Sequence, residues 1–383
     1  MSRLRITAMD IRRCGGAVSG VASARGAWSE RQGLLLQLWD DLGHQGLGEA
    51  SPLPGYSPDD LDACEAELHA FEYSALDLDL APDGPPGSLR TRLAAVTSRV
   101  RAPAARFALE TALLDVISRR ARRPLWHVLQ ALHGQNGSTD HAADVALNAV
   151  CTASDARVLD EIAAARDRGI RCFKLKVGRD FERELAVLEA VRARHGDEIS
   201  LRVDANQTWT PDQSRAHLQR LAAVAPEYVE EPTPEPLAHL PALAPLPVPV
   251  ALDESLAQAF ASEEFQAGAF VTGLDALLAG GLVTVLVLKP MLLGGLIRVM
   301  ALAARARAHR ADVVISHLFD GPVALAACAH LAVALATPRA CGLDRHTGLQ
   351  AWPEIAIPFV GQARIAVPHQ AGLGISAPLE TRP

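Results

Sequence analysis

Two lysines, Lys174 and Lys176, lie two positions apart in an otherwise apolar segment, F-K-L-K-V-G at 173–178. The segment has the character of a β-strand, and side chains alternate between the two faces of a strand, so both ammonium groups point the same way. Holding two cations together in a protein core is costly. An amine whose protonated form is destabilised becomes a usable base. The alternative is an edge strand that leaves both lysines in water.

Three acidic residues end other apolar segments. Asp204 ends L-R-V-D, Glu230 follows Y-V, and Asp253 follows V-A-L. Three converging carboxylates would repel one another and raise each other's pKa if no cation were present. A ligand set made only of oxygens suits Mg²⁺, or Mn²⁺, better than zinc. The alternative for each acid is that it caps the helix that follows its strand.

A third lysine, Lys289, ends the segment V-T-V-L-V-L-K at 283–289. If Lys176 and Lys289 flank the cation, a bound carboxylic acid has an amine near each face of its α-carbon. Removing the α-proton then gives an enediolate, whose charge a divalent cation offsets. Lys174 and the cation should both lower the pKa of Lys176. The alternative reading of Lys289 is a surface lysine.

Arg202 lies two residues before Asp204, so it faces the same side of that strand, one layer deeper. Its guanidinium group either orients the carboxylates or binds a second anionic group of the substrate. An ion pair with Glu230 or Glu231 is the other interpretation, and the sequence leaves both open.

The elements that carry these residues follow a regular rhythm. Short β-rich segments alternate with amphipathic helices at the roughly 30-residue interval of β/α units. One helix start is marked by Thr210, Pro211 and Gln213. The alternation predicts a (β/α) barrel, whose strand ends form one mouth. A doubly wound sheet is the competitor, but no G-x-G-x-x-G or Walker-type loop follows a strand. The expected strands begin near Val145, Arg171, Ile199, Glu227, Val248, Val283, Asp312 and Arg339.

The first third of the chain has an α+β character. A strand over 33–39 and a hairpin partner over 46–50 precede a proline-rich loop at 51–58. One helix is expected near 59–71 and another from Pro103, a favoured first-turn residue.

Three parts follow from this reading. We expect an α+β capping domain over 1–135, a barrel over 136–350, and a tail over 351–383 that packs on the capping domain. The segment H-G-Q-N-G-S at 133–138 has the composition of a domain boundary.

Composition excludes several classes of function. The net charge is -7 and there is no basic run, so nucleic acid and anionic membranes are not expected partners. The six cysteines are scattered and form no C-x-x-C pair. No signal peptide or bilayer-spanning segment stands out. We expect a cytoplasmic protein that binds a small carboxylate, and the sequence is compatible with a homo-oligomer.

Taken together, the K-x-K strand, the D-x-N strand end, the E-E-P, the D-E-S and the later lysine resemble the muconate-lactonising branch of the enolase superfamily. The resemblance implies a (β/α)7β-type modified TIM barrel with a capping domain. It also implies Mg²⁺ ligation by Asp204, Glu230 and Asp253. Lys176 is then the acid/base lysine, Lys174 its partner and Lys289 the lysine on the opposite face.

The segment G-E-A-S-P-L-P-G-Y-S at 48–57 is similar to the capping-domain loop of o-succinylbenzoate synthases, dehydratases of menaquinone biosynthesis. This finer resemblance implies a syn β-elimination of water from a cyclohexadiene carboxylate. It also implies substrate contacts from Tyr56, Arg202, Asn206 and Ser316.

Other activities of the same superfamily stay open. An N-acylamino acid racemase or dipeptide epimerase would use the same lysines as two bases. Dipeptide epimerases generally carry Asp-x-Asp near the last strand, and this chain has only half of it, in L-D-R-H at 343–346. Muconate cycloisomerisation is a further option. His317 either lines the pocket or packs beneath it, and a catalytically silent barrel that serves as a binding protein is the alternative from another class.

Overall fold

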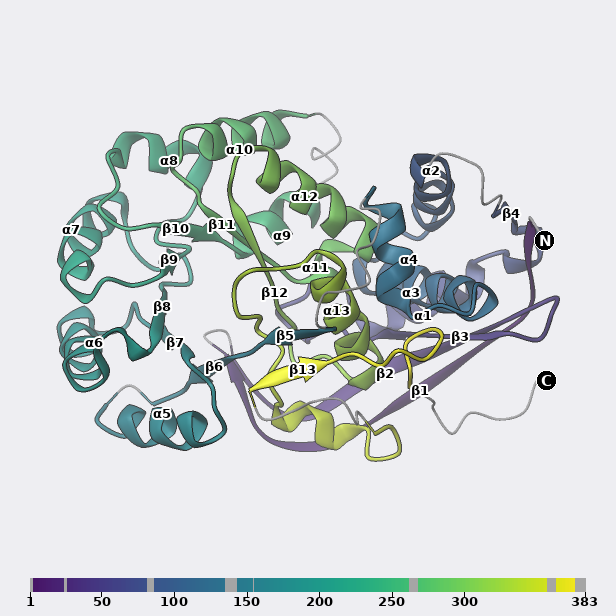
Figure 1. Ribbon diagram of the computed structural model, residues 1–383, viewed down its shortest axis with the longest axis horizontal. Coiled ribbons are helices and arrows are strands. Elements are labelled where there is room, and N and C mark those ends of the chain that lie inside the picture. The colour runs from purple at the N-terminus through teal and green to yellow at the C-terminus, as the bar shows by residue number, and fades with distance from the viewer. Residues whose placement is uncertain are drawn as a thin grey trace.

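A computed structural model describes residues 3–23, 26–80, 86–134, 143–153, 155–261, 268–356 and 363–375 of the 383-residue chain. An N-terminal antiparallel sheet with helices packed on it lies beside a curled parallel sheet with helices around it (Figure 1). In these residues, no helix is both long enough and apolar enough to cross a bilayer.

The N-terminal sheet has the strand order β3-β2-β1-β4. The predicted hairpin is confirmed, since Leu34 pairs with Ala50 and Trp39 with Gln45. The long first strand was not predicted. The elements of this part are β1 (Arg3–Ser23), β2 (Gly26–Asp40), β3 (Gln45–Ala50), α1 (Leu61–Ala70), η1 (Tyr73–Ala75), β4 (Asp77–Asp79), α2 (Pro86–Thr97), α3 (Pro103–Arg120) and α4 (Leu125–Leu132).

Helix α3 packs directly on β3, and two glycines make this approach possible. A Cβ atom at Gly46 would lie 2.2 Å from the carbonyl oxygen of Ala112, and one at Gly48 would lie 2.0 Å from that of Ala108. No larger residue fits either position. This packing fixes the end of β3, which leads into the loop at 51–58.

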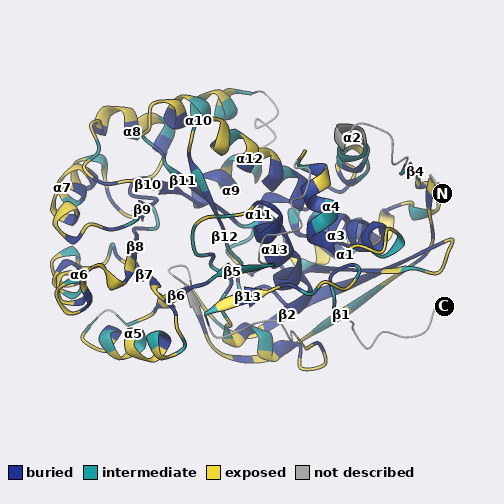
Figure 2. Cartoon of the chain, in the orientation of Figure 1, coloured by how far each residue is buried: buried dark blue, intermediate teal, exposed yellow. Residues whose placement is uncertain are grey.

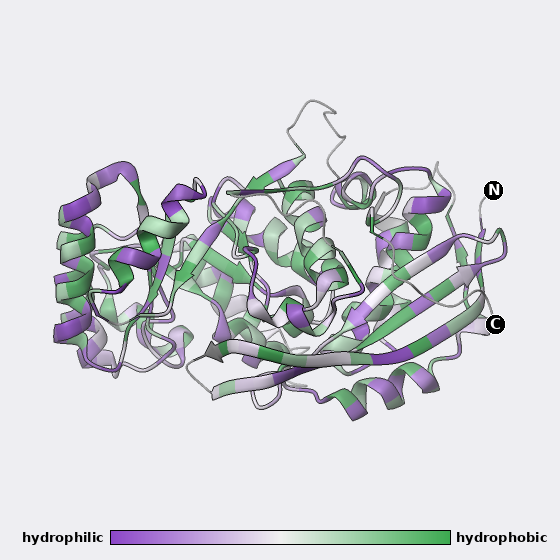
Figure 3. Cartoon of the chain, turned by 90° about the horizontal axis from the view of Figure 1, so that it is seen from below, coloured by the Kyte–Doolittle hydropathy of each residue, from purple (hydrophilic) through white to green (hydrophobic). Residues whose placement is uncertain are grey.

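The parallel sheet has the sequential order β12-β11-β10-β9-β8-β7-β6. Such an order lacks the reversal of a doubly wound sheet, so the barrel interpretation is confirmed. Several of its helices are exposed on their outer side and buried toward the strands (Figure 2), with hydrophilic residues outermost (Figure 3), whereas the helix Pro322–Ala334 is buried on all sides. The strands are β6 (Asn148–Cys151), β7 (Cys172–Lys176), β8 (Ser200–Asp204), β9 (Tyr228–Glu230), β10 (Val250–Leu252), β11 (Val285–Leu288) and β12 (Asp312–Ile315).

The helices of the barrel follow its strands in turn. The predicted start at Thr210 is confirmed as a capping box, in which the Thr210 side chain accepts from the Gln213 amide and the Gln213 side chain accepts from the Thr210 amide. The helices are α5 (Val158–Asp167), α6 (Phe181–His195), η2 (Gly196–Glu198), α7 (Pro211–Leu221), η3 (Ala222–Val224), α8 (Pro236–Leu243), α9 (Glu254–Ala261), α10 (Ala269–Ala279), α11 (Pro290–Leu293), α12 (Leu296–Ala308) and α13 (Pro322–Ala334).

The eighth strand, expected near Arg339, is reduced to two residues. Cys341 forms a parallel bridge with Leu147, and Gly342 forms one with Ser316. The two bridges join the edge strands β6 and β12 and close the barrel. A Cβ atom at Gly342 would lie 2.5 Å from the Ser316 hydroxyl oxygen, which explains a glycine at this point.

The last described residues return to the first part of the chain. The Leu373 amide donates to an Asp115 carboxylate oxygen of α3 at 2.8 Å, and the Leu125 amide of α4 donates to the Gly372 carbonyl at 2.9 Å. A short strand, β13 (Arg364–Ala366), pairs with β5 (Asp144–Ala146), and η5 (Thr347–Ala351) packs on β1. The predicted boundary at 133–138 lies mostly outside the described residues.

Candidate active site

Five of the charged residues singled out in the sequence meet at the carboxyl end of the barrel strands. Lys176, Asp204 and Glu230 are the last residues of β7, β8 and β9, and they pair in register across the three strands. Asp253 follows β10 directly, and Lys289 follows β11. Because the carboxyl ends of parallel barrel strands form one rim, all five lie at the same mouth. The strand order places β8, β9 and β10 between the two lysines.

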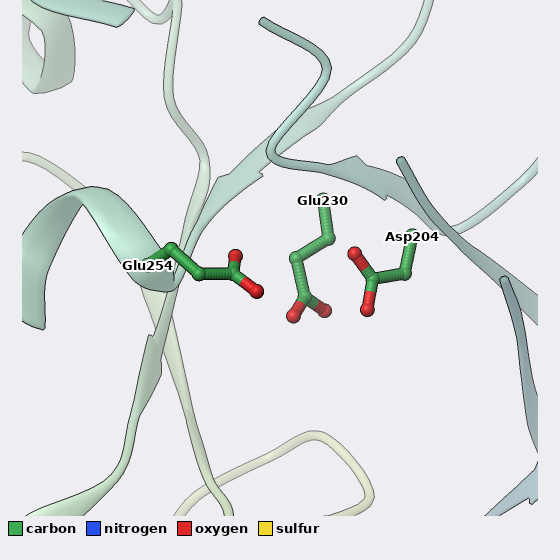
Figure 4. A group of neighbouring side chains, drawn as sticks. All are labelled: Asp204, Glu230 and Glu254. Atoms are coloured by element: carbon green, nitrogen blue, oxygen red, sulfur yellow. The ribbon is translucent and has the colours of Figure 1, made fainter. Parts of the chain in front are cut away.

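The carboxylates gather into a close group. Oxygens of Asp204, Glu230 and Glu254 all lie within 4.8 Å of one another, and Figure 4 shows the three side chains pointing toward one another from β8, β9 and the start of α9. Asp253, the ligand predicted from sequence, instead accepts a hydrogen bond from the Lys289 ammonium group. The site therefore contains four carboxylates, two of them adjacent in sequence.

The arrangement fits a hard cation. Glu230 Oε2 and Glu254 Oε2 are buried and have no hydrogen-bond partner within the described part of the chain. Burial raises the pKa of Glu230, and Lys174 opposes this effect. Asp204 and Asp253 add repulsion, so the pKa of Glu230 lies well above its usual value. Buried carboxylate oxygens without a donor are costly. A divalent ion with a preference for oxygen ligands would supply the missing positive charge.

The two lysines of β7 differ in their surroundings. The half-buried Lys174 ammonium group contacts Glu230 Oε1 at 2.7 Å and Asp204 Oδ2 at 2.9 Å. Burial lowers the pKa of Lys174, but these carboxylates outweigh burial and hold it well above its usual value. Lys176 is exposed, and in the described residues no hydrogen bond or ion pair is found for it. Although the residue as a whole is exposed, desolvation of its ammonium group lowers its pKa; Asp204 opposes this effect, and Lys174 and Lys289 lower the pKa further.

Tyr56 brings the N-terminal loop to the mouth. Its hydroxyl donates to Glu254 Oε1 at 3.1 Å and accepts from Lys289 Nζ at 3.4 Å. The Lys289 ammonium group also lies 5.5 Å from the centre of the Tyr56 ring. Lys289 and Glu254 belong to the barrel, so Tyr56 links the two parts of the molecule at the site.

Two other predicted contact residues also lie near the mouth. Asn206 donates from its side-chain amide to Glu254 Oε1 at 2.9 Å, and its backbone amide donates to Asp204 Oδ1 at 3.0 Å. Asn206 therefore supports the carboxylate group. Ser316 follows β12 and is half-buried, with its hydroxyl 3.3 Å from the Gly342 carbonyl oxygen.

Both ring nitrogens of the half-buried His317 contact backbone groups, and both predicted positions, lining the pocket and packing beneath it, stay open. Its Nδ1 accepts from the Phe319 amide at 3.1 Å, and its Nε2 lies 3.1 Å from the Asp344 carbonyl oxygen. The His346 ring lies 4.3 Å away. Burial lowers the pKa of His317 to about 4, so the ring is neutral at physiological pH.

Arg202 lies at the other end of the barrel. It donates to Glu227 Oε2 at 2.7 Å, to the Ala340 carbonyl at 2.8 Å and to Asn148 Oδ1 at 3.0 Å. The expected alternative partners, Glu230 and Glu231, are not its partners in the structure. A cavity of about 350 Å³ lies here, but Glu227 and Asp312 also bind Arg339, so its charges are paired. Arg202 therefore has protein partners at the far end of the barrel from the carboxylate group, and its substrate contact stays a prediction.

The positions of two further residues near the site were not predicted from the sequence. Glu231 is buried and accepts from the Asp253 and Ser255 amides at 2.7 and 2.9 Å, which fixes the start of α9. Its place beside Glu230 in E-E-P was the available signal. Val150 of β6 is 50% exposed, whereas its neighbours Ala149 and Cys151 are buried on the α5 side of the strand. Val150 therefore faces the barrel interior, where it pairs in register with Lys174. In the sequence it is an ordinary strand valine.

Comparisons with known proteins point in one direction. The chain is 30% identical over 307 residues to an o-succinylbenzoate synthase of Desulfotalea psychrophila, covering 74% of this chain and 76% of that protein. The structure matches a muconate lactonising enzyme of Pseudomonas fluorescens with TM-score 0.78, at 22% identity over 98% and 97% of the two chains. A dipeptide epimerase of Enterococcus faecalis, solved with Mg and the dipeptide L-Leu-L-Tyr, matches with TM-score 0.79, at 22% identity over 97% and 99%.

The family assignment follows from the sequence match and the fold together. Residues 157–380 match the family described as enolase C-terminal domain-like, and the barrel with its N-terminal sheet has the fold of the two solved enzymes. The chain belongs to the enolase superfamily, in its muconate-lactonising branch.

Proposed function

We propose that this protein is a Mg²⁺-dependent dehydratase of the o-succinylbenzoate synthase type, acting in menaquinone biosynthesis. It would remove the proton α to a carboxylate and then eliminate water from the β position with syn geometry. The observation that carries this proposal is the placement of Lys176 and Lys289 on strands that flank the carboxylate group. The o-succinylbenzoate synthase relative supports the finer assignment.

Asp204, Glu230 and Asp253 would hold the metal, with Glu254 close to them. When bound, Mg²⁺ would offset the negative charge that the substrate carboxylate gains as the α-proton leaves. Three ammonium groups and four carboxylates meet at this mouth, a small surplus of negative charge. A divalent cation would reverse the surplus, which favours an anionic substrate.

The lysines take different roles because their partners differ. Lys176 has the lowered pKa and no carboxylate partner among the described residues, so its neutral amine would accept the α-proton. The same ammonium group then protonates the departing hydroxyl on that face, which yields water and a new carbon–carbon double bond. Lys289 would stabilise the enediolate from the opposite face. Lys174, bound by two carboxylates, stays protonated and helps to lower the pKa of Lys176.

A racemase or epimerase is the second candidate, because Lys176 and Lys289 flank the carboxylate group. A dipeptide would require an acid for its ammonium group near the last strand. Here Asp344 is held by Arg168 through both carboxylate oxygens, at 3.0 and 2.7 Å. This bidentate pair counts against dipeptides and leaves N-acylamino acids as the competing substrates.

Proton-exchange NMR in D₂O tests the proposal with three candidates: the cyclohexadiene precursor, N-succinyl amino acids and dipeptides. We expect Mg²⁺-dependent loss of water from the first. Lys176→Ala should abolish turnover while Mg²⁺ binding persists, and Arg179→Ala, on the same chain segment but outside the charged group, is the control. Near-wild-type rates for Lys176→Ala, or inversion of an amino-acid centre without dehydration, would contradict the proposed function.

A further inference from the structure

Glu49 has a buried carboxylate in an unusual place. It lies in β3 of the N-terminal sheet, yet it accepts hydrogen bonds from the Gly321, Val323 and Ala324 amides of the barrel at 2.6, 3.0 and 3.1 Å. These are the free amides at the start of α13, where a negative charge is favourable. The Ser51 hydroxyl is a fourth donor, at 2.5 Å. One carboxylate therefore ties the two parts of the molecule together.

The contact tolerates little change on the barrel side. A Cβ atom at Gly321 would lie 2.6 Å from either carboxylate oxygen of Glu49. The absence of a side chain at Gly321 is thus what allows Glu49 to reach the helix start.

Arg31 makes a second tie beside the first. It is 1% exposed, and it donates to the Ser51 and Pro52 carbonyls at 2.6 and 3.0 Å and to the Phe319 carbonyl at 3.2 Å. Two segments are thereby joined: the loop at 51–57 and the barrel segment at 318–324. Buried hydrogen bonds to charged groups are among the strongest in proteins.

The loop held in this way carries Tyr56 to the site. Leu53 is fully buried and packs with Leu292 and Leu318, which follow β11 and β12. Three residues later, Tyr56 contacts Lys289 and Glu254. The loop and Tyr56 therefore connect Glu49 to Lys289.

We propose that Glu49 is a positioning residue, which anchors the loop at 51–57 to the start of α13 and so holds Tyr56 against Lys289 and Glu254. The effect on rate rests on the proposed function, whereas the anchoring itself does not. Glu49 touches no reacting atom, so it acts through Tyr56.

The anchoring is tested by hydrogen–deuterium exchange, which needs no substrate. Glu49→Gln keeps the shape of the side chain but replaces one acceptor oxygen with a donor that faces the α13 amides. We expect faster exchange in peptides covering 51–57 and 318–324 and unchanged exchange in β7 and β8. Glu189→Gln makes the same chemical change on the exposed side of α6 and should alter neither peptide. Unchanged exchange in Glu49→Gln would overturn the proposal.

The action through Tyr56 is tested by a double-mutant cycle on turnover. Glu49→Gln alone should lower kcat roughly tenfold or more, with a smaller change in KM, because a misplaced contact group is costly. In a Tyr56→Phe background the same change should cost less than about twofold. Equal losses in both backgrounds would refute the role. Should Glu49→Gln not fold, Gly321→Ala displaces the carboxylate from the barrel side and must give the same coupling to Tyr56.

If the wild type turns over none of the candidate substrates, the proposed function fails and the exchange result still decides the anchoring. If turnover is normal but exchange does not change, the proposed function stands and the anchoring role of Glu49 is wrong.

Discussion

The three lysines at the mouth are the only lysines in the sequence, although lysine and arginine together number 37. All the other residues in that total are arginines, and the arginine side chain does not lose its proton in proteins. The sequence singled out these three residues because each interrupts or ends an apolar segment, and the structure brings them to one mouth. It could not separate their roles, since the ion pairs of Lys174 and Lys289 depend on partners from neighbouring strands.

We expect Lys176 to titrate at the lowest pH of the three lysines, below the usual value of about 10.4. Lys174 and Lys289 both have raised pKa values, since carboxylates outweigh the effect of burial on each. Only a neutral amine accepts a proton, so kcat/KM should rise as pH increases through the pKa of Lys176. ¹⁵N-lysine NMR gives three ammonium signals to follow, and Lys176→Arg assigns the relevant one. A Lys176 signal that titrates last would contradict its role as base.

The adjacent acids Asp253 and Glu254 make a second prediction at this scale. Glu254 Oε1 is already bound by Tyr56 and Asn206, which leaves only its Oε2 for a cation. Asp253 contacts Lys289, whose ammonium group a divalent cation can displace. We therefore expect Asp253→Asn to weaken Mg²⁺ binding tenfold or more, or about 1.4 kcal/mol, and Glu254→Gln to weaken it less. Isothermal titration with Mg²⁺ measures both. The reverse order would make Glu254 the third ligand.

At the scale of elements, patterns with a local cause were predictable. The hairpin of β2 and β3 and the start of α7 each follow from turn or capping residues within a few positions. Helix α3 shows the limit: its predicted apolar residues are buried, but so is nearly every residue from Ala104 to Ser118. Burial on all sides comes from packing against β2, β3, α1, α4 and α11, and a helical period in one segment cannot reveal it.

The capping box of α7 gives a prediction of stability. Thr210→Ala removes the acceptor of the Gln213 amide, which should lower the free energy of unfolding by about 1 kcal/mol. Gln219→Ala, at an exposed position of the same helix, should change it by less than about 0.5 kcal/mol. Urea unfolding at fixed pH measures both. Equal effects for the two variants would show that the cap contributes nothing.

At the scale of the whole molecule, the two parts of the chain meet at the site through contacts that no local pattern encodes. Glu49 and Gly321 are 272 positions apart in the chain, and Tyr56 reaches residues 198 and 233 positions away. Composition and motif spacing therefore predict which residues carry charge to the mouth. They do not predict how the N-terminal loop lies on it, because that depends on the docking of one part against the other.

The metal should couple the site to the stability of the whole fold. The pKa of Glu230 is raised in the folded protein. Between the pKa of Glu230 in the unfolded chain and its pKa in the folded protein, the folded state therefore binds more protons. The free energy of unfolding without metal should then fall as pH rises through that range. Bound Mg²⁺ should reverse the loss, adding about 2.7 kcal/mol at a free concentration one hundred times its Kd. Thermal unfolding in EDTA and in excess Mg²⁺ across this pH range measures both effects.

Glu230→Gln separates this explanation from a purely structural role for Glu230. The neutral amide relieves the repulsion among the carboxylates, so the variant should unfold at a higher temperature than the wild type in EDTA, yet gain nothing from Mg²⁺. Glu189→Gln should match the wild type under both conditions. A variant that is less stable in EDTA would show that the ion pair with Lys174 outweighs the repulsion, and a variant that still gains from Mg²⁺ would remove Glu230 from the proposed ligands. A cation site built from excess carboxylates therefore requires that Glu230→Gln unfold at a higher temperature than the wild type in EDTA and at a lower one in excess Mg²⁺.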